Sequence, residues 1–153
     1  MADPVSIAAG TIVTVKDVTT GVIGGTAIEI KEVQTIGAVS QRSAEVNATP
    51  LNATAVRYIA GLKDGQTQEI SMFWQPSDAG QQLLKTIYDK RGVAEITIKP
   101  PDVSQQIRYN LTILGHDVNT GTVDSAKMRM VNGRISSDPV FEANTNPAYD
   151  ATP

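Results

Sequence analysis

The sequence predicts a mainly β protein: an antiparallel β-sandwich or barrel with one flanking α-helix, an extended loop and terminal arms. Two observations favour this fold class. Several short segments alternate apolar and polar residues, and a single segment, residues 76–91, has helical periodicity. The length of 153 residues suits one domain, and no internal repeat or boundary divides residues 1–153.

The alternating segments are expected to be half-buried strands, because a period of two places every second side chain on one face. In the last of them, Met128 and Met130 should face the core while Lys127 and Arg129 face solvent. Asp64-Gly65 is a favourable pair for a hairpin turn. The expected strands are residues 11–18, 27–33, 66–74, 93–100, 105–115 and 126–136.

The helix expected over residues 76–91 follows directly from a strand. Pro76 cannot continue a central strand because it has no N–H to donate. Asp78 and Gln81 have the spacing of a capping box, and Gly92 is a natural stop. Trp74 is in phase with the apolar face of the preceding strand, which predicts a packing role. The junction residues are Trp74, Pro76, Asp78, Gly80 and Gln81, and the apolar stripe of the helix is Leu83, Leu84, Ile87 and Tyr88.

Three segments lack any periodicity. Residues 37–54 are small and polar, and they are long for a structureless connection, so we expect a loop that orders against a partner. Residues 1–10 and 138–153 are expected to be loose terminal arms of the same kind. These segments favour a protein that assembles with neighbouring subunits.

Signatures of catalysis and of cofactor binding are weak. The sequence has no cysteine and one histidine, His116, which we expect to be a turn residue and not a ligand or catalytic group. Gly21 to Thr26 is glycine-rich but has no phosphate-binding lysine. A net charge of -3 gives no general attraction to nucleic acid, and neither a signal peptide nor a membrane-spanning segment is apparent. We therefore expect no enzyme activity, no cofactor, no metal and no membrane.

Residues 57–92 resemble the major tail tube protein of long-tailed, siphovirus-like bacteriophages. That family carries an aromatic-Ile-Ala-Gly-Leu-x-Asp-Gly segment, matched here by Tyr58 to Gly65. A strand and then Pro-x-x-x-Gly-Gln-Gln-x-Leu follow, matched by Pro76 to Leu84 with the spacing of the family. Upstream, the loop of this chain departs from the family around Glu45 and Asn47.

The resemblance implies a structural virion protein that forms hexameric rings, whose strands pair into an inner barrel and which stack into a hollow tube. DNA would pass through the lumen without specific binding, and assembly would occur in the bacterial host cytoplasm. The expected partners are further copies of the chain and the tape measure, tail-tip and tail terminator proteins. Deleting Val39 to Asn52 should leave a folded monomer that cannot polymerise. Candidate interface residues are Val39, Gln41, Arg42, Glu45, Asn47, Leu51, Asn52 and Tyr58, and candidate lumen residues are Glu29 and Glu32.

Three alternatives remain open on the sequence. The tube protein of a contractile injector or of a type VI secretion system would have nearly the same fold. A small β-sandwich module that binds a ligand such as carbohydrate should display exposed aromatic residues, and aromatics are only 5% of this chain. An enzyme on a small barrel would have to rely on His116.

Overall fold

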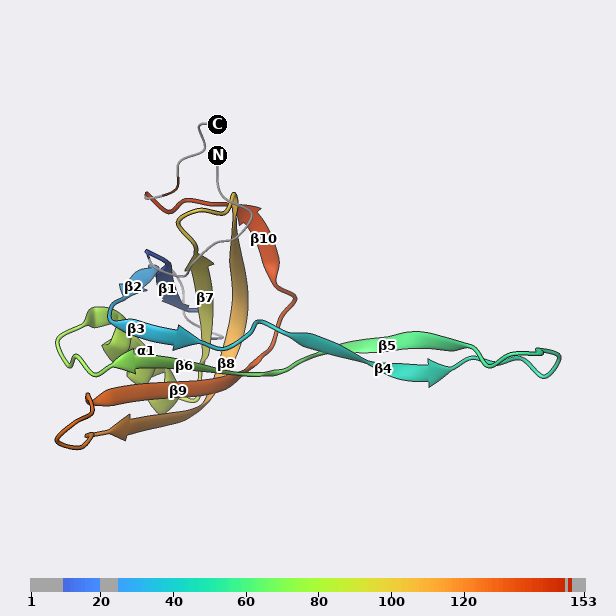
Figure 1. Ribbon diagram of the computed structural model, residues 1–153, viewed down its shortest axis with the longest axis horizontal. Coiled ribbons are helices and arrows are strands. Elements are labelled where there is room, and N and C mark those ends of the chain that lie inside the picture. The colour runs from blue at the N-terminus through green and yellow to red at the C-terminus, as the bar shows by residue number, and fades with distance from the viewer. Residues whose placement is uncertain (1–9, 20–24, 148, 150–153) are drawn as a thin grey trace.

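The computed structural model describes residues 10–19, 25–147 and 149 of the chain (Figure 1). Nine of the ten residues expected to form an N-terminal arm, and most of the glycine-rich turn, lie outside the described residues. The elements in chain order are β1 (Ile12–Asp17), β2 (Ile28–Ile30), β3 (Val33–Ile36), β4 (Gln41–Asn47), β5 (Tyr58–Gly65), β6 (Thr67–Phe73), α1 (Ala79–Asp89), β7 (Val93–Lys99), β8 (Gln105–Asn119), β9 (Met128–Ile135) and β10 (Val140–Ala143).

Eight antiparallel strands form one strongly bent sheet in the order β2-β1-β7-β8-β9-β6-β3, and β10 also pairs with β8. The bend lies in β8, a strand of 15 residues whose two main partners, β7 and β9, pair with different parts of it. Residues 107–112 of β8 pair with β7, and residues 111–119 pair with β9. The sheet thereby folds into the two layers of a sandwich, which confirms the predicted fold class.

The two end strands of this order, β2 and β3, are neighbours in the chain. Lys31 and Glu32 join them, and Glu32 adopts a positive φ of 63°, which interrupts the extended backbone. The single strand expected over residues 27–33 is therefore two short strands. Because the chain links both ends of the sheet, the sandwich is nearly closed, like a barrel.

The core lies between the two layers and is covered on one side by α1. The alternating residues of β8 enter it as predicted, with Tyr109 and Leu111 buried. Leu84 and Ile87 of the helix are completely buried, and Leu83 and Tyr88 pack on the same cluster. Burial raises the pKa of the Tyr109 phenol, whose hydroxyl donates to Gln68 Oε1. An aliphatic core with one satisfied aromatic hydroxyl matches the low aromatic content.

The helix begins at Ala79 and ends at Asp89, which is shorter than the predicted span at both ends. Its C-terminus is a Schellman motif, in which Gly92 N–H donates to Ile87 O at 2.8 Å and Arg91 N–H donates to Tyr88 O at 3.0 Å. Arg91, and not the glycine, takes the left-handed position, with φ 55°. Gly92 is needed for another reason, since a Cβ there would lie 2.1 Å from Thr19 Oγ1.

The predicted orientation of β9 is wrong. Arg129, Val131 and Ile135 are the buried residues, while Met128 and Met130 are half-buried on the opposite face. The prediction failed because it assumed that Arg129, as a charged residue, faces solvent. Arg129 instead turns inward and donates from Nη1 to Gln81 O at 3.1 Å. Burial lowers the pKa of its guanidinium.

Two predicted connections are also wrong. Residues 37–54 are not a structureless loop, because Gln41–Asn47 is β4 and pairs with β5. Asp64-Gly65 is not a hairpin turn, because the chain runs on from β5 into β6 there, with Gln66 N–H bonded to Ser40 O at 3.1 Å. The glycine is required by a close approach: a Cβ at Gly65 would lie 1.8 Å from Ile135 O.

The C-terminal arm predicted over residues 138–153 is not loose at its start. Val140–Ala143 forms β10 on the edge of β8, and Asn146, which is buried, donates to Gly10 O and Lys99 O at 3.2 and 2.7 Å. Residues 148 and 150–153 lie outside the described part of the chain.

Candidate assembly surfaces

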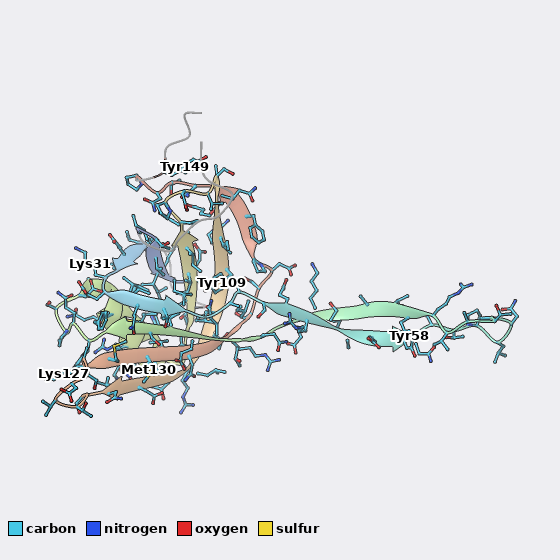
Figure 2. The ribbon with its side chains drawn as sticks, in the orientation of Figure 1. Lys31, Tyr58, Tyr109, Lys127, Met130 and Tyr149 are labelled. Atoms are coloured by element: carbon cyan, nitrogen blue, oxygen red, sulfur yellow. The ribbon has the colours of Figure 1, made fainter. Side chains whose placement is uncertain are left out.

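The ribbon of β4 and β5 with its connecting tip, residues 41–65, projects from the sandwich as a long arm (Figures 1 and 2). Its apolar side chains are uncovered, with Leu51 fully exposed, Leu62 93% exposed and Tyr58 60% exposed. A two-stranded ribbon with water on both faces is at best marginally stable by itself. Soluble monomers rarely display large contiguous apolar patches. The arm therefore has the properties of a surface that another chain completes.

The two faces of the arm differ in charge. Cross-strand partners share a face, so Val46 lies beside Ile59 and Glu45 lies beside Ala60. The face of Val46 and Ile59 continues with Ala44, whose Cβ lies 3.6 Å from the point that a Cβ at Gly61 would occupy. From Ala44 to Ile59 this face carries no charged side chain. The opposite face carries Glu45 and the apolar Tyr58.

Two side chains of the sandwich hold the root of the arm. Arg134 of β9 donates from Nη2 to Asp64 Oδ2 at 2.6 Å. Asp138 accepts a hydrogen bond of 2.8 Å from Gln41 Nε2 and lies 3.7 Å from Lys63 Nζ. The hydrogen bond from Gln41 and the charge of Lys63 together lower the pKa of Asp138. These contacts set the direction in which the arm leaves the sandwich.

The tip of the arm, residues 48–57, is ordered by its own polar groups. Asn47 Oδ1 accepts from Thr49 N–H at 3.0 Å, and Thr49 Oγ1 accepts from Arg57 N–H at 2.8 Å. Seven of the eight predicted interface residues are brought together on the arm, and Val39 packs against the core instead. The seven are Gln41, Arg42, Glu45, Asn47, Leu51, Asn52 and Tyr58.

Four apolar arm residues were missed by the sequence reasoning: Val46, Val56, Ile59 and Leu62, all exposed. The available signal was the apolar run beside Tyr58, which the sequence analysis considered only as part of the segment Tyr58 to Gly65. Once β5 is recognised as a strand without a core to cover it, its apolar residues become candidates for contact.

At the strand-to-helix junction, hydrogen bonds join three segments: the start of α1, the β2–β3 connection and the end of β6. Asp78, the helix N-cap, accepts from Gln81 N–H at 3.2 Å and from Lys31 N–H at 3.1 Å, both at Oδ2. Gln81 does not return a bond to Asp78 as a capping box would. Its buried amide instead donates to Lys31 O and Phe73 O at 3.1 and 2.9 Å and accepts from Gln75 N–H at 3.0 Å.

The remaining junction residues support the same contact. A Cβ at Gly80 would lie 2.5 Å from Glu29 O, so only glycine lets the helix approach β2 this closely. Trp74 is half-buried, and its backbone N–H donates to Lys127 O at 3.0 Å. Pro76 lies in the turn before the helix, where its carbonyl accepts from Gln82 Nε2. The junction thus fixes the helix to the β2–β3 connection.

His116 lies on β8, not in a turn as expected, and its ring stacks on Tyr88 of α1 with ring centroids 6.0 Å apart. Burial lowers its pKa, and the positive charges of Arg129 and Lys85 lower it further. Among the described residues, no group of three or more acidic, histidine or cysteine side chains is placed to hold a metal ion. In the same part of the chain, no helix is long and apolar enough to span a membrane.

Two strand edges of the four-stranded layer β3-β6-β9-β8 are open in the described structure. β3 pairs only with β6, so its outer edge is free. Beyond the register shift at Leu114, residues 115–119 of β8 pair with β9 on one side, whereas β7 reaches only residue 112 on the other. Leu114 and Val118, at and beyond the shift, are exposed. An open edge at each end of one layer is suited to strand pairing between copies.

Several solved structures have a similar fold. The chain is similar to a chain of the SPP1 tail tube, with a TM-score of 0.68 and 14% identity over 91% of this chain and 80% of that one. It is also similar to a chain from the tail of an empty gene transfer agent particle with C6 symmetry, with a TM-score of 0.62 and 16% identity over 86% of this chain and 96% of that one.

This chain has the phage tail tube fold. The same fold extends to a chain of the sheath–tube complex of an extracellular contractile injection system, at a TM-score of 0.60 and 9% identity over 92% of both chains. No protein-family model matches the chain, and the search of curated proteins found no match. The match to the SPP1 tail tube chain covers 91% of this chain, so the shared fold accounts for most of its length.

Proposed function

We propose that this chain is a structural virion protein that polymerises as stacked hexameric rings into a hollow tail tube, through which DNA passes into the host. The observation that carries the proposal is the arm, residues 41–65, which leaves Leu51, Tyr58 and Leu62 uncovered on a folded subunit. Exposure of this kind is a liability in a monomer and a connector in a polymer. The tail tube fold and the C6 symmetry of one similar structure support six-membered rings.

Strand pairing between neighbours would use the open edges of β3 and of residues 114–119 of β8. These edges lie at opposite ends of the layer β3-β6-β9-β8, so one copy would offer β3 to β8 of the next. Such a head-to-tail contact closes into a ring when the rotation between copies allows it. Four strands from each of six copies would form a barrel of 24 strands around the lumen.

The lumen would be lined by the face of this layer that points away from the core. Glu69 and Asn132 are cross-strand partners on that face, and so are Asp117 and Met130. Acidic and uncharged side chains let DNA slide, whereas lysine and arginine would each pair with phosphate and slow it. Of the predicted lumen residues, Glu32 directly precedes β3, and Glu29 lies on β2 in the other layer. Both remain candidates for the rim of the lumen.

The proposed location is the virion tail, after assembly in the bacterial host cytoplasm. The expected partners besides further copies are the tape measure, tail-tip and tail terminator proteins. The similar structures include baseplate and tube-terminating cap assemblies of the anti-feeding prophage, which supports contacts with components at both ends of a tube. A structural role requires no cofactor and no catalytic residue.

The tube protein of a contractile injector is the second candidate. The similarity to the chain of the sheath–tube complex covers 92% of both chains and favours this reading on fold alone. The two candidates differ in whether a sheath surrounds the tube. Binding of the purified polymer to a sheath protein produced from the same genome would favour the injector.

The test is negative-stain electron microscopy of the purified protein at high concentration, with and without tail-tip complexes as nuclei. A matched variant replaces residues 43–63 with Asn-Gly, so that the paired Arg42 and Asp64 close a short hairpin and the contact of Arg134 is kept. This replacement removes the arm more selectively than deleting Val39 to Asn52. That deletion would also remove Val39, which packs on the core, and would leave β5 without its partner strand.

The full chain is expected to form hollow tubes with a regular axial repeat, and the arm-truncated variant is expected to remain a folded monomer. Tubes of normal repeat from the truncated variant would show that the arm is not the assembling element. A full chain that stays monomeric even with nuclei would reject the tube and favour the ligand-binding module.

A further inference from the structure

The strand β10 presents an unusually apolar open edge. Val140, Phe141 and Ala143 are exposed, with Phe141 60% exposed, and β10 pairs with β8 on one side only in the described structure. Natural edge strands usually carry charges or irregularities that prevent pairing with other chains. The one charged residue of β10, Glu142, does not serve this purpose, because its side chain is directed back onto the sheet.

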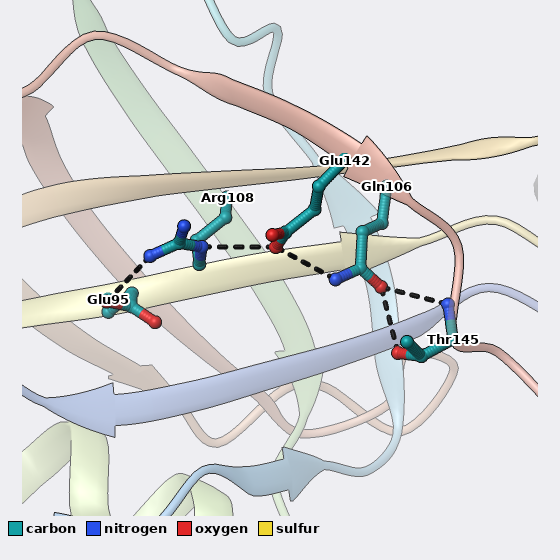
Figure 3. A network of polar contacts seen from close by, with 5 residues as sticks. All are labelled: Glu95, Gln106, Arg108, Glu142 and Thr145. Atoms are coloured by element: carbon teal, nitrogen blue, oxygen red, sulfur yellow. Dashed lines mark hydrogen bonds and ion pairs between the residues drawn. The ribbon is translucent and has the colours of Figure 1, made fainter.

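The contacts of Glu142 and of the residues after it make β10 a firm surface and not a fraying end (Figure 3). Glu142 Oε1 accepts from Gln106 Nε2 at 2.9 Å and from Arg108 Nε at 3.1 Å. Arg108 also lies 3.7 Å from Glu95 on β7. Thr145 donates to Gln106 Oε1 from both its N–H and its hydroxyl, at 3.1 and 3.0 Å. A preformed surface loses little conformational entropy when a partner binds.

The arm carries a face of matching chemistry. Val46, Ile59 and Ala44 form its uncharged face, as described above, and Val46 and Ile59 are 43% and 56% exposed. Neither this face nor the exposed side chains of β10 include an unpaired charge, so contact between these side chains desolvates mainly apolar atoms. Burial of that kind is favourable in proportion to the area removed from water.

A subunit cannot make this contact with its own arm. The arm is fixed at its root by Arg134 and Asp138 and extends away from β10 (Figure 1). With 7 and 8 residues, the two strands alone extend the arm by roughly 25 Å, at about 3.3 Å per residue, and the tip extends it further. The occupant of β10 must therefore come from another molecule, and an identical chain supplies the matching face.

We propose that the uncharged face of the arm, formed by Ala44, Val46 and Ile59, packs on Phe141 and Ala143 of β10 in a second copy of this chain. The two surfaces lie at different places on the subunit, so each copy offers one of each and the contact repeats head to tail. The inference rests on the proposed function and specifies where the arm docks.

Disulfide cross-linking tests the contact directly, because the sequence has no cysteine and introduced pairs are unambiguous. The test variant carries Ile59→Cys and Phe141→Cys, both at exposed positions that leave the core intact. The control variant carries Ile59→Cys and Val123→Cys, since Val123 is fully exposed on the β8–β9 connection. A disulfide requires Cα atoms within about 7 Å, so oxidation reports close contact only.

The expected result is a ladder of cross-linked chains from the Ile59→Cys/Phe141→Cys variant at polymerising concentration, and no ladder from the control. Tubes that form without this ladder would overturn the docking site while leaving the proposed function intact. If tubes never form, the proposed function fails, but cross-linked dimers of the test variant alone would still support the contact. Absence of cross-links in every state would overturn it.

Discussion

Leu84 in the helix and Leu62 in the arm are the same residue type in opposite surroundings. Leu84 is completely buried among residues of the sandwich, whereas Leu62 is 93% exposed on a ribbon that projects from it. The sandwich thus places apolar side chains in its own core, and the arm presents them outward. Burial of this kind stabilises the subunit, and in the function proposed above the exposed arm is the part that contacts other subunits.

Matched truncations of these two leucines give the largest expected contrast. Leu84→Ala should lower the free energy of unfolding of the monomer by about 2–5 kcal/mol, through lost burial and a cavity. Leu62→Ala should change it by less than about 0.5 kcal/mol and should weaken polymerisation. Urea unfolding of dilute monomer and sedimentation of concentrated protein measure the two properties. An equal loss of monomer stability in both variants would mean that the arm packs on its own subunit.

Two adjacent glutamines at the start of the helix sharpen the comparison within the sandwich. Gln81→Ala removes the partners of Lys31 O, Phe73 O and Gln75 N–H and should cost at least about 2 kcal/mol, because buried polar groups without partners are destabilising. Gln82→Ala removes an exposed bond to Pro76 O and should cost less than about 0.5 kcal/mol. Thermal unfolding of the two variants provides the measurement. Similar melting temperatures would contradict the stabilising role of the buried Gln81 amide.

The lowered pKa of His116 predicts how the stability of the sandwich depends on pH. Burial, with the charges of Arg129 and Lys85, lowers the pKa of His116 in the folded state, so the unfolded chain binds the proton more tightly. Stability from this group is therefore complete above the unfolded pKa of about 6.5 and decreases as pH falls toward the folded value. In the His116→Gln variant, the free energy of unfolding should change less between pH 7 and pH 5 than in the parent protein, because the titrating group is removed.

Asp17 provides the matched control for that pH profile. Burial raises the pKa of its carboxyl, but hydrogen bonds from Lys90 and Thr19 outweigh burial and lower it overall. Its contribution to stability is present above the unfolded pKa of about 3.9 and is lost at more acidic pH. Asp17→Asn should therefore leave the slope between pH 7 and pH 5 unchanged. An unchanged slope in His116→Gln would assign the dependence to another group.

The same contrast between sandwich and arm explains what could be predicted from the sequence. The strand containing Tyr109 and Leu111 and the helix containing Leu84 were predictable, because a core imposes a regular period on the residues that face it. The arm has no core, so β4 carries no period and was expected to be a loop. The predicted orientation of Arg129 was wrong for a different reason. Its inward orientation depends on a hydrogen bond to Gln81 O, a contact across 48 residues that no local pattern encodes.

The candidate interface remains a prediction, and the structure shows only the form of the segment that carries most of it. Lack of periodicity drew attention to Gln41, Glu45 and Leu51, which the structure places on the arm, because residues without a core to face do not follow a local pattern. The contribution of β5 was not predicted, since the apolar residues Ile59 and Leu62 were considered only as part of the segment Tyr58 to Gly65 that carries the resemblance. Which edge strands stay open, β3 and β8 included, depends on the complete pairing of the sheet and could not be read from any one segment.

The smallest expected effect concerns the root, where sandwich and arm meet. Asp138→Asn removes the charge that faces Lys63 but retains an acceptor for Gln41, so the melting temperature of the monomer should not change measurably. A looser root lets the arm sample more directions, and the critical concentration for polymerisation should rise by up to about fivefold, the scale of one exposed ion pair.

Asp124→Asn makes the same change of charge at an exposed position on the β8–β9 connection and should leave the critical concentration unchanged. If both variants raise it equally, net charge and not the direction of the arm controls assembly. If only Asp138→Asn raises it, the root contributes to assembly by holding the arm in a direction from which it can meet the next subunit, because the two variants carry the same net charge.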